Sequence, residues 1–123
     1  MVVIEYLGGV PRRPAAARVE ASVRDGMLHL KQGDFLRGWT CRVPLTTITG
    51  AELATARDVG AAGIQPLDGR GPLGDMREYL LAIEAPLRDG ATTIILRGPP
   101  ATLERLRQEI LRGRMRAAKQ WRS

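Results

Sequence analysis

With 123 residues, the chain is long enough for one domain with a sizeable core and too short for two ordinary domains. Its 19 basic residues exceed its 13 acidic residues, and the net charge is +6. The excess is local: seven bases lie from residue 105 onward against Glu109 alone, so residues 1–104 carry 12 of each sign. The longest clean apolar run, Tyr79–Ile83, is far shorter than the ~20 residues of a membrane-spanning helix, which excludes that class of protein.

The cellular compartment is predicted from the cysteine content and the first residues. A single cysteine, Cys41, excludes an intrachain disulfide framework and is typical of a reducing compartment, although it leaves an intermolecular bridge open. The beginning of the sequence has no basic segment ahead of an apolar one, and Glu5 interrupts it early, unlike a secretory signal. We therefore expect a soluble cytoplasmic protein.

Alternation of apolar and polar residues predicts strands along most of the chain. Asp25-Gly26 and Arg88-Asp89-Gly90 are typical of tight hairpin turns between such strands. Pro44 favours an edge strand or a strand end. The glycine-rich segment 58–77 has no sustained period and is predicted to be a long loop. The seven predicted strands are 2–7, 18–24, 27–31, 40–45, 51–57, 78–84 and 91–97.

The last segment is predicted to be a helix that packs against the strands. Proline is tolerated in the first helical turn, so Pro99-Pro100 indicates the start, with Thr102 as a competing cap. Apolar residues at helical spacing form a stripe that must be buried, and Leu111 makes this stripe wider. We expect this stripe to cap the sheet; it consists of Leu103, Leu106 and Ile110.

Residues 113–123 are predicted to be a basic C-terminal extension of the domain. Gly113 costs a helix about 1 kcal/mol relative to alanine, so the chain beyond it is expected to fray or to be ordered by contact. Trp121 suits a lipid interface or a nucleic-acid base. The candidate anion-binding residues here are Arg114, Arg116, Lys119, Trp121 and Arg122; a solvated terminus or a self-association contact is the alternative.

Strands followed by one terminal helix do not form a βαβ pattern, so the sheet should be antiparallel. This order resembles the pleckstrin-homology-like (PH-like) fold, in particular small bacterial PH-like domains. The matching segments are the Asp25-Gly26 hairpin, VPLTTITGAEL at 43–53, the YLLAIE and TTIILR hairpin, and the helix ATLERLRQEI at 101–110. The resemblance implies a mainly β domain over 1–123, a seven-stranded antiparallel bent sandwich or partial barrel capped by the helix. Such scaffolds usually bind lipids, peptides or proteins and do not usually catalyse.

The resemblance also implies one place for an anionic ligand. PH domains that bind phosphoinositides use basic residues near the first hairpin, which points to Arg12 and Arg13, with Arg18 or Arg24 beside them. The lysine-spaced-arginine signature of those domains is absent here. Solvated loop charges are therefore the alternative interpretation.

Catalytic and metal-binding patterns are not apparent. His29 falls on the polar phase of its strand and Cys41 on the apolar phase of another, which argues against a nucleophile and base pair. The chain has no cysteine or histidine cluster for a metal. The sequence GRGPLG at 69–74 lacks the lysine and the helix of a phosphate-binding loop. We expect no enzymatic activity, no metal and no cofactor.

The leading hypothesis is a non-enzymatic PH-like interaction module that binds a protein partner or its own copies. Strand edges and an apolar strip at Leu80 and Ala82, opposite the face that carries Leu81, would serve self-association. Peripheral binding to an anionic membrane through the basic extension is the alternative, and nucleic acid is less favoured. The loop 58–77 either forms part of the edge of a binding site or only connects two strands and binds no ligand.

Overall fold

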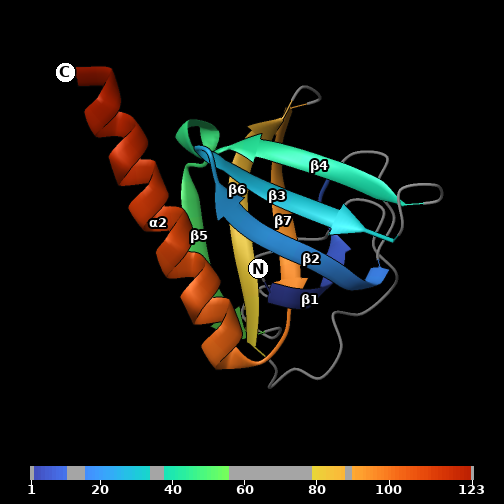
Figure 1. Ribbon diagram of the computed structural model, residues 1–123. Coiled ribbons are helices and arrows are strands. Elements are labelled where there is room, and N and C mark those ends of the chain that lie inside the picture. Colours follow the sequence, from blue (N-terminus) through green and yellow to red (C-terminus); the bar gives the residue numbers. More distant parts are fainter. Residues whose placement is uncertain (1, 11–15, 34–37, 56–78, 88–89, 123) are drawn as a thin grey trace.

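The computed structural model describes residues 2–10, 16–33, 38–55, 79–87 and 90–122, with the backbone alone at 16–17, 87, 90–92 and 118–122. Seven strands, one short 3-10 helix and one long α-helix are found in these ranges (Figure 1). In chain order they are β1 (Val2–Gly8), β2 (Ala16–Arg24), β3 (Met27–Gln32), β4 (Trp39–Pro44), η1 (Leu45–Thr47), β5 (Gly50–Thr55), β6 (Tyr79–Leu87), β7 (Gly90–Arg97) and α2 (Pro100–Arg122).

The seven strands form a single antiparallel sheet with the order β4-β3-β2-β1-β7-β6-β5. The ribbons of β2, β3 and β4 cross those of β5, β6 and β7 steeply, so the sheet folds over into two layers (Figure 1). Strands β4 and β5 are its two ends, and no ladder between them closes a barrel within the described residues. The predicted fold, a bent antiparallel sheet capped by one C-terminal helix, is confirmed.

Strand β1 lies where the two layers meet, and its backbone is irregular there. Its register against β2 shifts between Ile4 and Tyr6, and its register against β7 shifts between Tyr6 and Gly8. Gly8 and Gly9 have φ angles of 138° and 118°, which L side chains rarely adopt. A side chain at residue 9 would also collide with the backbone of Thr93. These two glycines therefore allow the chain to leave β1 close against β7.

The hairpin between β2 and β3 has the turn that the sequence predicted. Asp25 and Gly26 have φ angles of 54° and 74°, as a two-residue turn with positive φ at both positions requires. Register across the hairpin pairs Val23 with Leu28 and Ala21 with Leu30. Alternate residues of β3 are buried, so the apolar phase of the hairpin faces the core as predicted.

Helix α2 caps the core with the predicted stripe. Leu103, Leu106 and Ile110 are fully buried in the main cluster, together with apolar residues from both layers of the sheet. The backbone N–H of Leu103 donates to the carbonyl of Pro99 at 3.0 Å, so the helix begins at Pro100 and Thr102 lies inside the first turn. The competing cap at Thr102 is therefore not used. The helix continues through Gly113 to Arg122 without a break.

Two local expectations were wrong. Leu45 was expected to end strand β4, but it begins η1, whose turn is closed by the N–H of Ile48 donating to the carbonyl of Leu45 at 3.2 Å, and its side chain is buried in the core. Leu80 was expected on an exposed strip, but it is fully buried with Ile95 in a second cluster that Leu7, Ala54 and Ala82 join. The face assignment was right, since Leu81 lies in the main core, but the opposite face is packed too.

Candidate functional site

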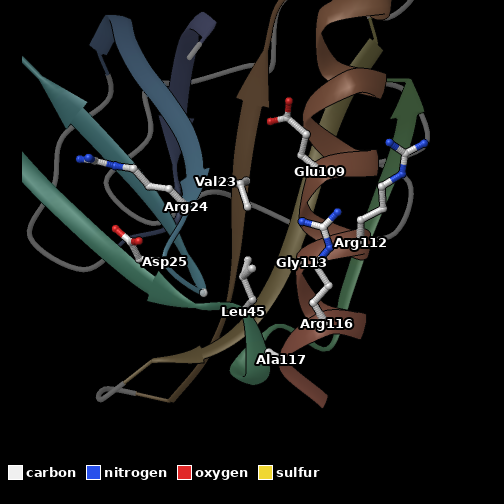
Figure 2. Close-up of a pocket in the computed structure, with 10 residues that line it drawn as sticks. Val23, Arg24, Asp25, Leu45, Glu109, Arg112, Gly113, Arg116 and Ala117 are labelled. Atoms are coloured by element: carbon white, nitrogen blue, oxygen red, sulfur yellow. The ribbon is translucent and has the colours of Figure 1, made fainter. Parts of the chain in front are cut away.

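A cavity of about 400 Å³ lies between the β2–β3 turn and the C-terminal half of α2 (Figure 2). We call it the turn–helix groove. One wall consists of the end of β2 and the turn, the other of α2, and η1 contributes to the bottom. Two segments more than 80 residues apart in the sequence thus build one site. The groove has an apolar floor and a charged rim.

The floor of the groove is apolar, and Gly113 determines its shape. Val23 and Leu45 contribute side chains from the sheet side, and Ala117 contributes one from the helix. A Cβ atom on residue 113 would stand 2.5 Å from Leu45 Cδ1 and 3.4 Å from Val23 Cγ1. With any other residue at this position, the end of the Leu45 side chain would have to shift to keep α2 this close to η1. Gly113 is a packing residue, and the basic extension beyond it starts as part of the groove wall.

The rim of the groove carries three arginines and two carboxylates. Arg24 and Asp25 lie on the turn wall, and Glu109, Arg112 and Arg116 lie on the helix wall. Figure 2 shows Arg24 and Arg112 extending outward from their walls, whereas Arg116 lies along the helix. All three arginines are exposed, and none has an ion-pair or hydrogen-bond partner in the described part of the chain. The rim thus carries guanidinium groups that are available to a ligand.

The carboxylates of the rim are less available than the arginines. Glu109 lies 3.8 Å from Arg105 Nε, one helical turn away, and is half-buried. Asp25 is exposed but held at a fixed place by its turn conformation. The lining residues contain no histidine, cysteine or serine that would act as a nucleophile or base. The groove thus combines an apolar floor with a rim of exposed guanidinium groups.

The structure unites residues that the sequence placed in separate hypotheses. Arg24, a candidate of the first hairpin, and Arg116, a candidate of the basic extension, lie on opposite walls of the groove. Arg18 is exposed at the other end of β2, about 20 Å from Arg24 at 3.3 Å per residue, and does not line the groove. Arg114 is exposed on α2 outside the lining.

The remaining candidates of the sequence lie outside the described part of the structure. The residues concerned are Arg12 and Arg13, the loop 58–77, and the side chains of Lys119, Trp121 and Arg122. The sequence did not indicate that Arg112, Asp25 and Glu109 are neighbours in one site. The one signal for them was Gly113, which was interpreted as a weak point in the helix and not as a close contact.

The two residues considered for catalysis lie apart. In the β3–β4 ladder His29 pairs with Arg42 and Leu30 pairs with Cys41, so His29 and Cys41 point to opposite faces of the sheet, as predicted. They form no nucleophile and base pair. Among the described residues, no group of three or more histidine, cysteine or acidic side chains is placed to hold a metal ion. Nor does any helix in the described ranges combine the length and apolar character needed to cross a membrane.

Comparison with known proteins gives no relative: no protein-family model, no curated protein and no solved structure matches this chain. The function must therefore be argued from the fold and from the turn–helix groove.

Proposed function

We propose that the protein is a non-catalytic, cytoplasmic interaction module of the PH-like type, which takes up a segment of a partner protein in the turn–helix groove. One observation carries the proposal: the groove has an apolar floor that Gly113 shapes and three rim arginines without partners among the described residues. Ligand sites in proteins are typically such concave, mostly apolar surfaces with a few polar groups that fix orientation. The order of the seven strands and the capping helix support the PH-like assignment.

Two observations favour a different protein as partner over a second copy of this chain. Leu80, the centre of the apolar strip considered for self-association, is fully buried. The free edge of β5 is partly occupied, because Arg107 Nε donates to the carbonyl of Ala51 at 3.0 Å. Edge strands without such protection are the usual route to pairing between copies. The groove is therefore the stronger candidate surface.

The test is a selection from an unbiased library of random displayed peptides against the full chain. Ala117→Gln places a long polar side chain on the groove floor without altering a fully buried residue, because Ala117 is half-buried. Ala101→Gln is the matched control, since Ala101 is exposed in the first turn of α2. We expect the selected peptides to bind the wild type and the Ala101→Gln control, and not to bind the Ala117→Gln variant.

The proposal fails if the selection yields no peptide, or if the peptides bind Ala117→Gln as well as wild type. Light scattering over micromolar concentrations tests whether the partner is a second copy of this chain. If the protein assembles and Ala117→Gln abolishes the assembly, a second copy fills the groove. If the protein is strictly monomeric, self-association is excluded.

A second candidate function is attachment to an anionic membrane surface through the end of α2. The observation that favours it is Met115, which is 62% exposed between the exposed residues Arg114 and Arg116. The last turns of the helix extend beyond the sheet (Figure 1). Each base near an anionic leaflet contributes about 1 kcal/mol. Co-sedimentation with phosphatidylserine vesicles, and loss of that binding in Met115→Ser, would establish this function; phosphatidylcholine vesicles are the control.

A further inference from the structure

We infer that the segment bound in the turn–helix groove is acidic and carries one apolar side chain between carboxylates. This inference rests on the proposed function and adds the chemistry of the partner. Three features of the groove lead to it: the charge of its rim, the shape of its floor and the positions of its two carboxylates.

The charge of the rim favours an anionic segment. The three rim arginines exceed the two rim carboxylates, and Glu109 is already close to Arg105. Arginine binds carboxylates with two parallel hydrogen bonds, and it loses little hydration in doing so. Since Arg24 and Arg116 have no partner in the described chain, a bound carboxylate would not have to displace an existing ion pair. Their field also attracts anionic segments from a distance.

The floor requires an apolar group as well as charge. Val23, Leu45 and Ala117 have no hydrogen-bonding side chain, so a segment with only acidic side chains would leave this apolar surface exposed to water. The volume of about 400 Å³ lies at the small end of ligand pockets, which run from about 300 to 1,000 Å³. One aliphatic side chain together with its backbone suits this space. The floor therefore selects an apolar anchor.

The two walls set the order of the charges along the segment. Arg24 stands on the turn wall and Arg116 on the helix wall, with the floor between them (Figure 2). Because Arg24 extends outward from the turn wall, a segment that crosses the floor and continues over that wall meets Arg116 on one side of the floor and Arg24 beyond the other side. Asp25 and Glu109 repel carboxylates at other places on the rim. The matching pattern is acidic, apolar, acidic.

A protein segment fits these features better than a membrane or a nucleic acid. The floor lies between two walls, where a flat bilayer does not reach, whereas Arg114 and Met115 are open to one. A nucleic-acid backbone supplies the negative charge but no aliphatic side chain for the floor. Recognition of acidic motifs by arginine clusters is an established mode of peptide binding.

The experiment measures fluorescence anisotropy of labelled nine-residue peptides with the full chain at low salt. The first probe has one leucine flanked by glutamates on both sides in a serine background. In the second probe glutamine replaces every glutamate, and in the third serine replaces the leucine. We expect the second and third probes to bind at least about ten-fold more weakly than the first, the size of effect that one lost charge-assisted or apolar contact produces.

Charge reversals locate the binding. Arg24→Glu and Arg116→Glu should each weaken the first probe by about ten-fold or more. Arg42→Glu and Arg114→Glu change the net charge equally at exposed positions that do not line the groove, on β4 and on α2. These controls should stay within about two-fold of wild type, as expected for screened charges away from the ligand. Thermal melting of all four variants checks that the fold is kept.

Each alternative result has a defined meaning. If the glutamine probe binds as well as the first, the acidic class is overturned, while the peptide selection still decides whether the groove binds protein at all. If all four charge reversals weaken the probe equally, the binding reflects net charge, and the inference is wrong. It is also wrong if phosphatidylserine vesicles displace the probe and lose their own binding with Arg24→Glu, because the groove then takes lipid headgroups.

Discussion

Gly113 of α2 and Leu45 of η1 lie so close together that a Cβ atom on residue 113 would stand 2.5 Å from Leu45 Cδ1. Leu45 is fully buried and its N–H donates to the carbonyl of Gly26, so its backbone is held in place and a Cβ atom on residue 113 would have to displace the end of its side chain. This contact fixes the distance between the C-terminal half of α2 and the β2–β3 turn. It therefore sets the width of the turn–helix groove.

Replacing Gly113 by alanine is expected to destabilise the fold. Overpacking costs about 1–3 kcal/mol, and the gain in helix propensity returns about 1 kcal/mol, so the free energy of unfolding should fall by up to about 2 kcal/mol. Urea unfolding measures the change. In a Leu45→Val background the Cδ1 atom is gone, and the same alanine should become neutral or stabilising. An equal loss in both backgrounds would contradict the contact.

The capping role of α2 is tested by Leu106→Asp. Leu106 is fully buried under the sheet, and a carboxylate placed there has no partner. We expect a loss of at least about 4 kcal/mol, a large share of the ~5–15 kcal/mol that stabilises a typical domain. Arg105→Asp, on the exposed side of the same turn, should change stability by less than about 0.5 kcal/mol. Similar melting temperatures for the two variants would refute the cap.

Sequence patterns predicted those parts of the fold that depend on neighbouring residues. The period of two in β2 and β3, the Asp25-Gly26 turn and the spacing of Leu103, Leu106 and Ile110 are local, and the structure confirms each of them. Leu45 was assigned to the strand because it continues the alternation of β4, whereas a 3-10 turn closed by the N–H of Ile48 begins at this residue. The exposure of Leu80 was wrong because Ile95 of another strand packs beside it, a contact that no local pattern encodes.

The candidate site was predictable only in fragments. The basic character of the last helix and the presence of Arg24 beside a turn are visible in the sequence. That Arg24 and Arg116 lie on opposite walls of one groove depends on how the sheet folds over and on the angle at which α2 crosses it. Gly113 looked like a helix breaker because propensity is a local quantity, whereas its role here is a contact with another element.

The pair Glu5 and Arg97 should couple β1 to β7 measurably. The two residues face each other in the ladder, and Arg97 Nε and Nη2 donate to the two carboxylate oxygens at 2.7 and 2.6 Å. The side chains are 26% and 32% exposed for Arg97 and Glu5, so solvent screens the pair only in part. A double-mutant cycle with Glu5→Gln and Arg97→Gln should give a coupling free energy of about 1 kcal/mol.

The exposed helical pair Arg105 and Glu109 is the natural comparison for this cycle. Its closest approach is 3.8 Å, and the side chains are 77% and 43% exposed. The same cycle should give a coupling free energy of at most about 0.3 kcal/mol. Equal coupling in the two pairs would contradict the importance assigned to bidentate geometry.

Arg107 is expected to stabilise the edge strand β5. Its Nε donates to the carbonyl of Ala51 at 3.0 Å, and its Nη1 lies 3.1 Å from Glu104 Oε1. Arg107→Met keeps the aliphatic stem but removes the donors, and we expect a loss of about 1 kcal/mol. Arg105→Met is the control. Hydrogen exchange in β5 should quicken in the first variant alone, and unchanged exchange would argue against this role.

Two substitutions of Asp25 distinguish its role in the turn conformation from the effect of its charge on the groove rim. At its φ of 54° asparagine is tolerated, whereas alanine is strained by about 1 kcal/mol. Asp25→Asn should therefore keep the unfolding free energy, and Asp25→Ala should lower it. Both substitutions remove a carboxylate from the groove rim. Both substitutions should therefore increase the affinity for the first probe, the peptide with one leucine between glutamates, by about two- to five-fold at low salt. Added salt should suppress this increase. If the affinity instead falls only in Asp25→Ala, the less stable variant, then the turn conformation and not the charge of Asp25 affects binding in the groove.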